Sequence, residues 1–300
     1  MKILIVGSKG FIGSHCVEFF SQNHEVWQCD IILDYNTPNY FIIEQNLNNF
    51  NEIFKNNEFD LCINCSGAAN VQYSINNPMV DFELNTYNII RILEAIRTNN
   101  SKCKLLTMSS AAVYGNPKTL PITPDASVHP LSPYGYHKMM AEQICEEYYK
   151  FWNIPNCNVR IFSTYGPGLK KQLLWDIFRK LINNDTIELY GTGNETRDFI
   201  YIDDLMNALD IIVKNSIFDS SSINVANGCQ ISVAKIAANI ESLFNGRKTI
   251  KFNGITREGD PLNWEADISQ ITKWGYSPKI DIITGIKQYH QWFINENILG

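Results

Sequence analysis

The sequence predicts an α/β protein in which helices cover both faces of a parallel, doubly wound sheet, followed by a smaller C-terminal domain. Two features of the 300-residue chain carry this prediction. In the first half, short apolar runs of strand length alternate with longer stretches of helical periodicity. A turn with three glycines, at residues 7–13, joins the first apolar run to the first helical stretch.

The elements of the first half are expected in a regular order. Each expected strand is a short, mainly apolar run, at residues 2–6, 25–29, 61–65, 104–109 and 158–162. Helices are expected at 11–20, 79–97 and 133–150, the last with a proline at its start. After Tyr165-Gly-Pro-Gly168 the pattern changes to a helix at 173–183, a glycine-rich turn at 191–193 and short elements. We therefore expect domains at 1–165 and 166–300, with some segments of the second returning to the first.

The overall charge argues against nucleic acid as a partner. The formal net charge is -6, and no run of Lys or Arg is longer than Lys170-Lys171. No stretch approaches the ~18 uninterrupted apolar residues of a membrane span, and the apolar run at 1–6 is too short for a signal-peptide core. We expect a cytoplasmic protein that binds neither nucleic acid nor membrane.

The eight cysteines are expected to be reduced thiols. Cys62 and Cys65 form the one CxxC pair, within an expected buried strand. Strand alternation directs the two thiols to opposite faces, and no second pair or nearby His completes a metal set. We therefore expect core packing and no metal site.

The glycine turn predicts a dinucleotide site. Gly7, Gly10 and Gly13 follow an apolar strand and open an amphipathic helix. Backbone N–H groups at the helix N-terminus, around Phe11 and Ile12, can therefore approach a pyrophosphate without a Cβ in the way. A tight strand-to-helix turn without a ligand is the competing interpretation.

Asp30 favours NAD over NADP. It ends the second expected strand, about 20 residues past the turn, where a carboxylate can bind the adenosine ribose and would repel a 2′-phosphate. The alternatives are that Asp30 only begins a surface loop, or that Asp34 takes this role.

Tyr134 and Lys138 form a candidate acid–base pair. They lie one helical turn apart on one face, so the ammonium can approach the phenol and lower its pKa from ~10 toward neutrality. Tyr134 could then act as a general base, although this spacing alone is common by chance. Ser110, at the end of an expected strand, could donate to a reacting carbonyl. A polar strand end is the alternative, and it is the one we prefer for Ser109.

Together these residues resemble the extended short-chain dehydrogenase/reductases, a Rossmann-fold family, in the branch that modifies nucleotide sugars and includes UDP-glucose 4-epimerase-like enzymes. The resemblance covers nearly the whole chain. Besides the glycine turn and the Tyr134/Lys138 pair, it rests on motifs in the same order: Ser66-Gly-Ala-Ala69, Asn85 in Glu83-Leu-Asn-Thr-Tyr-Asn88, Arg160-Ile-Phe-Ser-Thr-Tyr-Gly-Pro-Gly168, Gly191-Thr-Gly-Asn-Glu-Thr-Arg-Asp-Phe-Ile-Tyr-Ile-Asp-Asp204 and Arg257-Glu-Gly-Asp260.

The resemblance implies an NAD-binding first domain and a second domain that binds a nucleotide-diphosphate sugar. It makes Tyr134 the base, lets Lys138 also bind the nicotinamide ribose, and gives Ser110 a hydrogen bond to the sugar oxygen, with hydride moving between sugar C4 and nicotinamide. The implied cofactor contacts are Gly7, Gly10, Phe11, Ile12, Gly13, Asp30, Asn46, Leu47, Ser66, Gly67, Ala68, Asn85, Tyr134 and Lys138. The implied substrate contacts are Ser110, Ser163, Gln172, Leu173, Arg197, Arg257, Asp260 and Trp264.

Within the second set, the resemblance assigns Arg197 and Arg257 to the diphosphate and Asp260 to the nucleotide ribose. Surface ion pairing is the alternative for both arginines. Four departures from the family pattern bear on the site. Thr86 stands where Gly is usual after Asn85, Asn46-Leu47 replaces the usual Asp-Leu near the adenine, and Ser163 replaces a common Asn. Ala111-Ala112 stand where 4,6-dehydratases of this family carry Asp-Glu.

The alanine pair decides between reactions. Alanine cannot transfer the protons needed to eliminate water, so dehydration is disfavoured. An NAD-dependent 4-epimerase and an NAD(P)H-dependent 4-keto sugar reductase are left, and Asp30 favours the epimerase. A redox-sensing module without catalytic activity is a further alternative, disfavoured by the intact Ser110, Tyr134 and Lys138.

The resemblance also carries expectations about substrate and assembly. Trp264 matches a position that lines the sugar pocket, so a 2-hydroxyl sugar should fit better than a 2-acetamido sugar, although a plain core aromatic is the alternative. Family members commonly pair the two long helices, here 79–97 and 133–150, into a homodimer.

Overall fold

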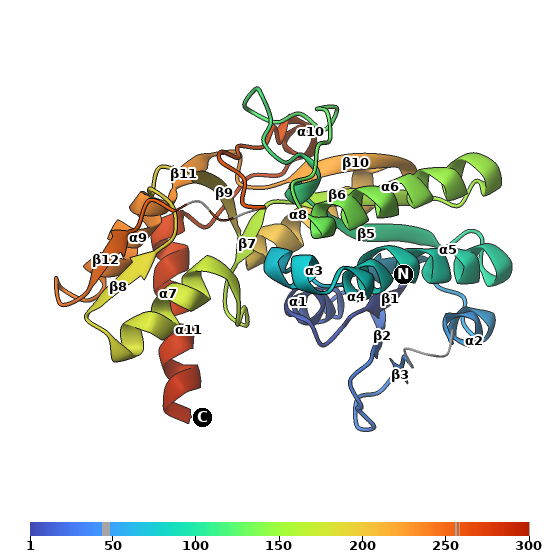
Figure 1. Cartoon of the computed structure of the whole chain (residues 1–300). Helices are drawn as coiled ribbons and strands as arrows, with labels where there is room; N and C mark the ends of the chain where they lie inside the picture. Colours follow the sequence, from blue (N-terminus) through green and yellow to red (C-terminus); the bar gives the residue numbers. More distant parts are fainter. Residues whose placement is uncertain (44–48, 256, 258, 300) are drawn as a thin grey trace.

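The large sheet of the protein is entirely parallel. The computed structural model describes residues 1–43, 49–255, 257 and 259–299. In these residues a seven-stranded sheet has the order β10-β6-β5-β4-β1-β2-β3 (Figure 1). The strand order reverses between β1 and β4, where ligands bind in sheets of this type. The strands are β1 (Lys2–Val6), β2 (Glu25–Asp30), β3 (Tyr40–Ile42), β4 (Leu61–Asn64), β5 (Lys104–Ser110), β6 (Asn156–Ile161) and β10 (Asp219–Val225).

Alternating side chains of the strands build a core on each face of the sheet. In β1, Ile3 and Ile5 pack into one buried cluster and Leu4 and Val6 into the other. Helices α1 (Phe11–Phe20) and α8 (Ile202–Asn215) contribute to the first cluster. Helices α2 (Phe50–Lys55), α5 (Asn88–Asn99) and α6 (Pro133–Trp152) contribute to the second. The predicted doubly wound α/β architecture is therefore confirmed.

The expected single helix at 79–97 is wrong in its interior. The chain forms α3 (Val71–Asn76), α4 (Pro78–Phe82), a π-helical turn at Glu83–Tyr87 and then α5. A single π turn has no sequence signature of its own, so the helical patterns on either side of it predict one continuous helix. The turn buries Asn85 and Thr86, two polar residues.

The remaining elements form a smaller part beside the large sheet (Figure 1). Its strands make a three-stranded sheet, β11-β9-β7, and a parallel pair, β12-β8. The elements are β7 (Ser163–Tyr165), α7 (Gln172–Asn183), β8 (Thr186–Leu189), β9 (Thr196–Tyr201), β11 (Gln230–Ser232), α9 (Val233–Ser242), β12 (Thr249–Phe252) and α11 (Ile282–Leu299). Helix α10 (Ser269–Lys273) lies instead against α8 and β10. Strand β10 and helix α8, although late in the chain, pack with the large sheet.

Most predicted boundaries fall within two residues of the observed ones. Strand β3 and helix α2 were not predicted, because three and six residues are too few to show a period. The expected separation of the two thiols is confirmed: Cys62 packs in the second cluster, whereas Cys65 packs against the first, with its Sγ 3.8 Å from that of Cys16.

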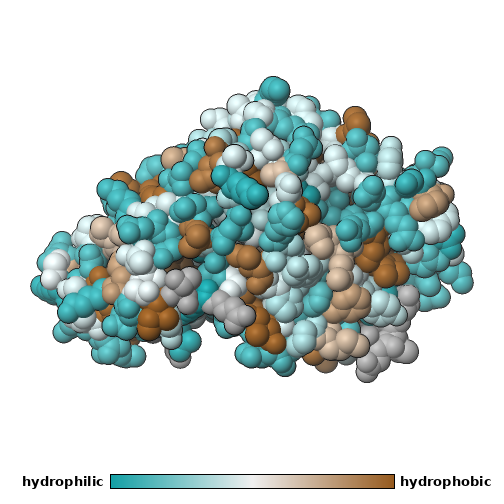
Figure 2. All heavy atoms as spheres, turned by 45° about the horizontal axis from the view of Figure 1, so that its top comes forward, coloured by the Kyte–Doolittle hydropathy of each residue, from teal (hydrophilic) through white to brown (hydrophobic). Residues whose placement is uncertain are grey.

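The described part of the chain has no helix long and apolar enough to cross a membrane, and no group of three or more His, Cys, Asp and Glu placed to hold a metal ion. On the face shown in Figure 2, apolar residues form separate patches among hydrophilic ones.

Candidate active site

The glycine turn lies between β1 and α1, at the carboxyl edge of the sheet. Gly7 has a φ of 77°, and its N–H donates to the Cys29 carbonyl at the end of β2 (2.8 Å). A Cβ on Gly7 would lie 2.8 Å from the backbone of Ser66, and one on Gly13 only 2.0 Å from the Gly7 carbonyl oxygen. Because Gly10 offers no capping side chain, the first N–H groups of α1 are left for an anion. The turn fits a pyrophosphate.

Asp30 lies directly beside this turn. Its carboxylate accepts hydrogen bonds from the backbone N–H groups of Lys9 (2.9 Å), Ile31 (2.8 Å) and Ile32 (3.3 Å). The carboxylate therefore fixes the end of β2 against the turn, and its contact with an adenosine ribose stays a prediction. Asp34 is instead engaged by Lys9 Nζ (2.5 Å). The predicted contacts Asn46 and Leu47 lie outside the described residues.

The segment after β4 forms the neighbouring wall of the site. Gly67 has a φ of 119°, and a Cβ there would lie 2.5 Å from Asn85 Oδ1 and 3.5 Å from Lys138 Nζ. Asn85 Nδ2 donates to the Ala68 carbonyl (3.0 Å), whereas its Oδ1 is buried without a partner among the described residues. Ser66 Oγ donates to Asn64 Oδ1 (2.5 Å). The predicted Ser66, Gly67, Ala68 and Asn85 therefore lie together, with an unused acceptor facing Lys138.

Ser110, Tyr134 and Lys138 meet where β5 ends beside α6. The Ser110 side chain lies near enough to the Tyr134 phenol to lower its pKa. Lys138 Nζ donates to the Met108 carbonyl (2.8 Å) and lies 6.0 Å from the centre of the Tyr134 ring. The Tyr134 N–H donates to Ser74 Oγ (3.1 Å), which holds the first turn of α6 in place. The three predicted catalytic residues thus form one group.

The expectation that Lys138 brings the pKa of Tyr134 toward neutrality is wrong in this structure. Burial raises the pKa of Tyr134 to about 12, and the nearby Ser110 side chain lowers it only in part. Burial also lowers the pKa of Lys138 to about 8. The ammonium points to a carbonyl rather than to the phenol, so a further positive charge is needed to make Tyr134 a base near neutral pH.

Side chains around this group support a structural role for Ser109. Its Oγ donates to Glu142 Oε1 (2.5 Å), and Glu142 also forms a buried salt bridge with Arg160 (2.7 Å). Ala111 is fully buried and Ala112 half-buried in the 3₁₀ turn that follows β5. Neither position next to Ser110 carries an acid, as expected from the sequence.

The predicted diphosphate contacts lie on the smaller part of the protein. The Arg197 guanidinium donates to the Thr196 carbonyl (2.8 Å), and burial lowers its pKa. Arg197 and Arg257 both act electrostatically on the carboxyl of Asp260, whose pKa burial raises. Arg257 also lies 4.2 Å over the ring of Tyr190, a half-exposed residue that the sequence analysis missed. The two arginines and the aspartate therefore form one charged cluster.

Trp264 connects this cluster to the Ser110 segment. Its Nε1 donates to the Gly115 carbonyl (2.9 Å), and its ring contacts Phe162 edge-on and lies 5.6 Å from Arg197 Cζ. Trp264 is thus fixed between the two halves of the predicted site.

The other predicted substrate contacts are less closely connected. Ser163 begins β7 and is half-buried. Gln172 is exposed, with a φ of 68°, and Leu173 packs against the main core. Within the described residues, no hydrogen bond or ring contact joins Gln172 or Leu173 to the Tyr134 group.

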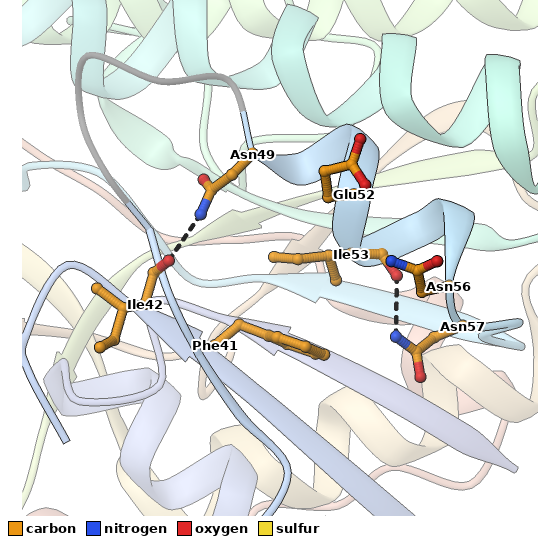
Figure 3. A pocket seen from close by; sticks show the side chains of 7 residues that line it. All are labelled: Phe41, Ile42, Asn49, Glu52, Ile53, Asn56 and Asn57. Atoms are coloured by element: carbon orange, nitrogen blue, oxygen red, sulfur yellow. Dashed lines mark hydrogen bonds between the residues drawn. The ribbon is translucent and has the colours of Figure 1, made fainter. Parts of the chain in front are cut away.

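A hollow elsewhere on the surface is separate from this site. It lies between β3 and α2 and is lined by Phe41, Ile42, Asn49, Glu52, Ile53, Asn56 and Asn57 (Figure 3). Asn49 and Asn57 are occupied with the backbone carbonyls of Ile42 and Ile53. Of the predicted site residues that the structure describes, none lines it.

Comparison with known proteins identifies the family of the chain. The model of the NAD dependent epimerase/dehydratase family matches residues 3–226. Protein CapI of Staphylococcus aureus is 28% identical, covering 98% of each chain. UDP-glucuronate 4-epimerase 6 of Arabidopsis thaliana is 24% identical, covering 98% of this chain and 72% of the relative. The structure of UDP-glucuronic acid 4-epimerase from Bacillus cereus, in complex with UDP-glucuronic acid and NAD, superposes with a TM-score of 0.89 at 24% identity, covering 99% of this chain and all of the other. The protein belongs to the NAD dependent epimerase/dehydratase family.

Proposed function

We propose that the protein is a UDP-sugar 4-epimerase that oxidises its substrate transiently at C4. The observation that carries this proposal is the Ser110–Tyr134–Lys138 group at the sheet edge that also bears the glycine turn, with two alanines in place of an acid pair. The names of two relatives, a putative UDP-glucose 4-epimerase and a UDP-glucuronate 4-epimerase, support the same substrate class.

The residues present define the role of each side chain. The glycine turn, Asp30 and the Gly67–Asn85 wall would hold NAD, which supplies a hydride acceptor and a positively charged ring. A positive charge beside Tyr134 lowers the pKa of its phenol, so that Tyr134 can take the proton of the C4 hydroxyl. Ser110 would donate a hydrogen bond to the sugar oxygen, and once the 4-keto sugar has turned its other face to the cofactor, Tyr134 would return the proton to that oxygen.

Asp30 favours the epimerase over a 4-keto sugar reductase. A carboxylate at this point repels the 2′-phosphate of NADPH, the cofactor that a reductase most often draws from solution. The test is to denature the purified protein and identify the released cofactor, then to incubate the protein with UDP-glucose and UDP-glucuronate and follow C4 inversion by NMR. Bound NAD and net inversion without added cofactor are expected, whereas stoichiometric NADPH consumption would contradict the epimerase.

The position of Trp264 supports a preference for sugars with a 2-hydroxyl group. Its ring is anchored by Gly115 and Phe162, so it cannot swing away to admit a larger substituent. We expect turnover of UDP-glucose or UDP-glucuronate at least tenfold faster than that of the 2-acetamido counterpart, by about the 1–3 kcal/mol that a mismatch in a pocket costs. Equal turnover of the two kinds of sugar would contradict this role of Trp264.

We also propose a homodimer formed through the two neighbouring helical segments α4–α5 and α6. Exposed apolar side chains gather there: Met79, Val80, Tyr87, Tyr136 and Met140. Light scattering after size-exclusion chromatography should give twice the 34.3 kDa chain mass. Met140→Glu should shift the protein toward the monomer, whereas Ile217→Glu, an exposed apolar position after α8, should not. A monomeric wild-type protein would refute the dimer.

A further inference from the structure

A buried carboxylate lies behind the Tyr134–Lys138 group and is not used in the proposed reaction. Asp81, in α4, is fully buried. One of its oxygens lies 2.6 Å from His137 Nδ1, and the other accepts a hydrogen bond from Asn85 Nδ2 (3.1 Å). In the described chain Asp81 forms no ion pair with Lys or Arg. Burying a carboxylate is costly unless hydrogen bonds compensate for it. The two side chains that bond to Asp81, His137 and Asn85, both belong to segments of the active site.

His137 attaches this carboxylate to the catalytic turn of α6. It lies between Tyr134 and Lys138 in the chain, next to the lysine. Its carbonyl accepts a hydrogen bond from Thr86 Oγ1 (2.8 Å), and its ring meets that of Phe82 edge-on. Because a carboxylate can only accept, the imidazole donates through Nδ1. The helical turn that carries the lysine is therefore held from α4 and from the π turn.

Asn85 carries the second connection. Its Nδ2 donates both to Asp81 and to the Ala68 carbonyl, which fixes the orientation of the amide. Its Oδ1 consequently faces Gly67, on the side where Lys138 Nζ lies, and has no partner among the described residues. Without the Asp81 acceptor the amide could turn over and present a donor to the lysine instead.

The charged groups around Lys138 also indicate a role for Asp81. The groups that act electrostatically on the buried ammonium of Lys138 are Asp81 from α4, Glu142 from α6, Cys65 after β4 and Lys171 before α7. Glu142 is already paired with Arg160. Asp81 is therefore the buried carboxylate available to support the charge on Lys138, and it raises the pKa of both Lys138 and Tyr134.

We propose that Asp81 is a positioning residue, which through His137 and Asn85 fixes the Lys138 ammonium and the Tyr134 phenol for proton transfer. This inference rests on the proposed function for its consequence in turnover, but not for its effect on Lys138.

The test measures Lys138 directly. The protein is labelled with ¹³C at the lysine ε-carbon and titrated by NMR, with the Lys138 signal assigned by its loss in Lys138→Met. In Asp81→Asn the Lys138 midpoint should fall by about 1 pH unit, because a nearby negative charge is removed. In His137→Ala it should rise, because Asp81 loses its donor and its charge is less compensated. His137→Asn, whose Nδ2 can replace Nδ1, should stay close to wild type.

Asp204→Asn is the matched control. Asp204 is also buried and accepts backbone hydrogen bonds, from Lys279 and Ile280, but it lies away from the site. It should lose stability without moving the Lys138 midpoint. Turnover of a UDP-sugar should fall about tenfold in kcat for both Asp81→Asn and His137→Ala, with KM changed less than threefold, whereas His137→Asn should turn over close to wild type.

The outcomes separate the two proposals. A Lys138 midpoint within 0.2 pH unit (roughly the resolution of the titration) of wild type in Asp81→Asn would overturn the role of Asp81, whatever the enzyme does. A shifted midpoint in a protein that inverts no UDP-sugar would keep the positioning role and refute the epimerase. If Asp81→Asn does not fold, His137→Ala decides, since an unchanged midpoint there also overturns the proposal.

Discussion

Replacing Gly13 by alanine tests the dinucleotide turn most directly. The new Cβ would lie 2.0 Å from the Gly7 carbonyl oxygen and 2.8 Å from its carbon, whereas ordinary contacts begin at 3.4 Å. Relieving this overlap requires the turn to move by more than an ångström. Over-packing of this kind costs about 1–3 kcal/mol, and displaced N–H groups lose charge-assisted hydrogen bonds worth about 1.5–3 kcal/mol each. We expect NAD affinity to fall by about 3 kcal/mol, or roughly 100-fold.

Gly10→Ala is the matched comparison. Gly10 has an ordinary φ of -74°, and its Cβ would lie 3.3 Å from the same oxygen, a contact that a small shift relieves. Its NAD affinity should stay within about tenfold of wild type. Isothermal titration calorimetry with NAD measures both variants, and thermal unfolding checks that they are folded. A folded Gly13→Ala protein that binds NAD within threefold (about 0.7 kcal/mol) of wild type would refute the reasoning.

Three further predictions concern the catalytic group and its support. Tyr134→Phe should reduce turnover at least 1,000-fold (about 4 kcal/mol) and spare NAD binding. Tyr136→Phe, two residues along α6 and exposed, should not affect turnover. Equal activity of the two variants would exclude Tyr134 as the base. The pKa of Lys138 is about 8 in the folded protein and ~10.4 in the unfolded chain, so the unfolded chain binds more protons between these two pH values. The free energy of unfolding of wild type, relative to that of Lys138→Met, should therefore rise by up to about 3 kcal/mol from pH 8 to 10. A constant or falling difference in urea unfolding would contradict the burial of the ammonium. Glu142→Gln breaks the buried salt bridge with Arg160 and should lower the free energy of unfolding by about 3 kcal/mol, as measured with urea. The exposed control Glu146→Gln should lower it by less than about 0.5 kcal/mol. Similar losses in both variants would show that the salt bridge does not stabilise the fold.

The sequence predicts the first half of the fold well because the central strands β1, β4, β5 and β6 are buried on both faces. β1 and β4 are continuous apolar runs, and the three glycines of the turn after β1 are visible in the sequence. The structure shows the steric reason for Gly7 and Gly13, where a Cβ would meet the backbone. The π turn at Glu83–Tyr87 could not be predicted, since its extra residue is defined by where Asn85 and Thr86 find partners across the fold.

The sequence likewise predicts some features of the site and not others. Ser110, Tyr134 and Lys138 could be proposed from spacing, but the pKa of the phenol could not, because it depends on burial and on where the lysine points. Asp81 had no signal of its own. Its role comes from contact with His137, 56 positions along the chain, and only the pairing of a buried carboxylate with a polar residue inside the Tyr134–Lys138 segment could have drawn attention to it.

Because β10 is late in the chain but belongs to the large sheet, the two parts of the protein should not be separable by limited proteolysis. The chain leaves this sheet after Ile161 and re-enters it at Asp219, where β10 pairs with β6. A protease cut near residue 165 would therefore not release an intact N-terminal fragment, because the fragment would expose the edge of β6 and its buried Val159 and Ile161. The amides of β10 should exchange with deuterium as slowly as those of β1, and the two parts of the protein should lose their structure in one cooperative step.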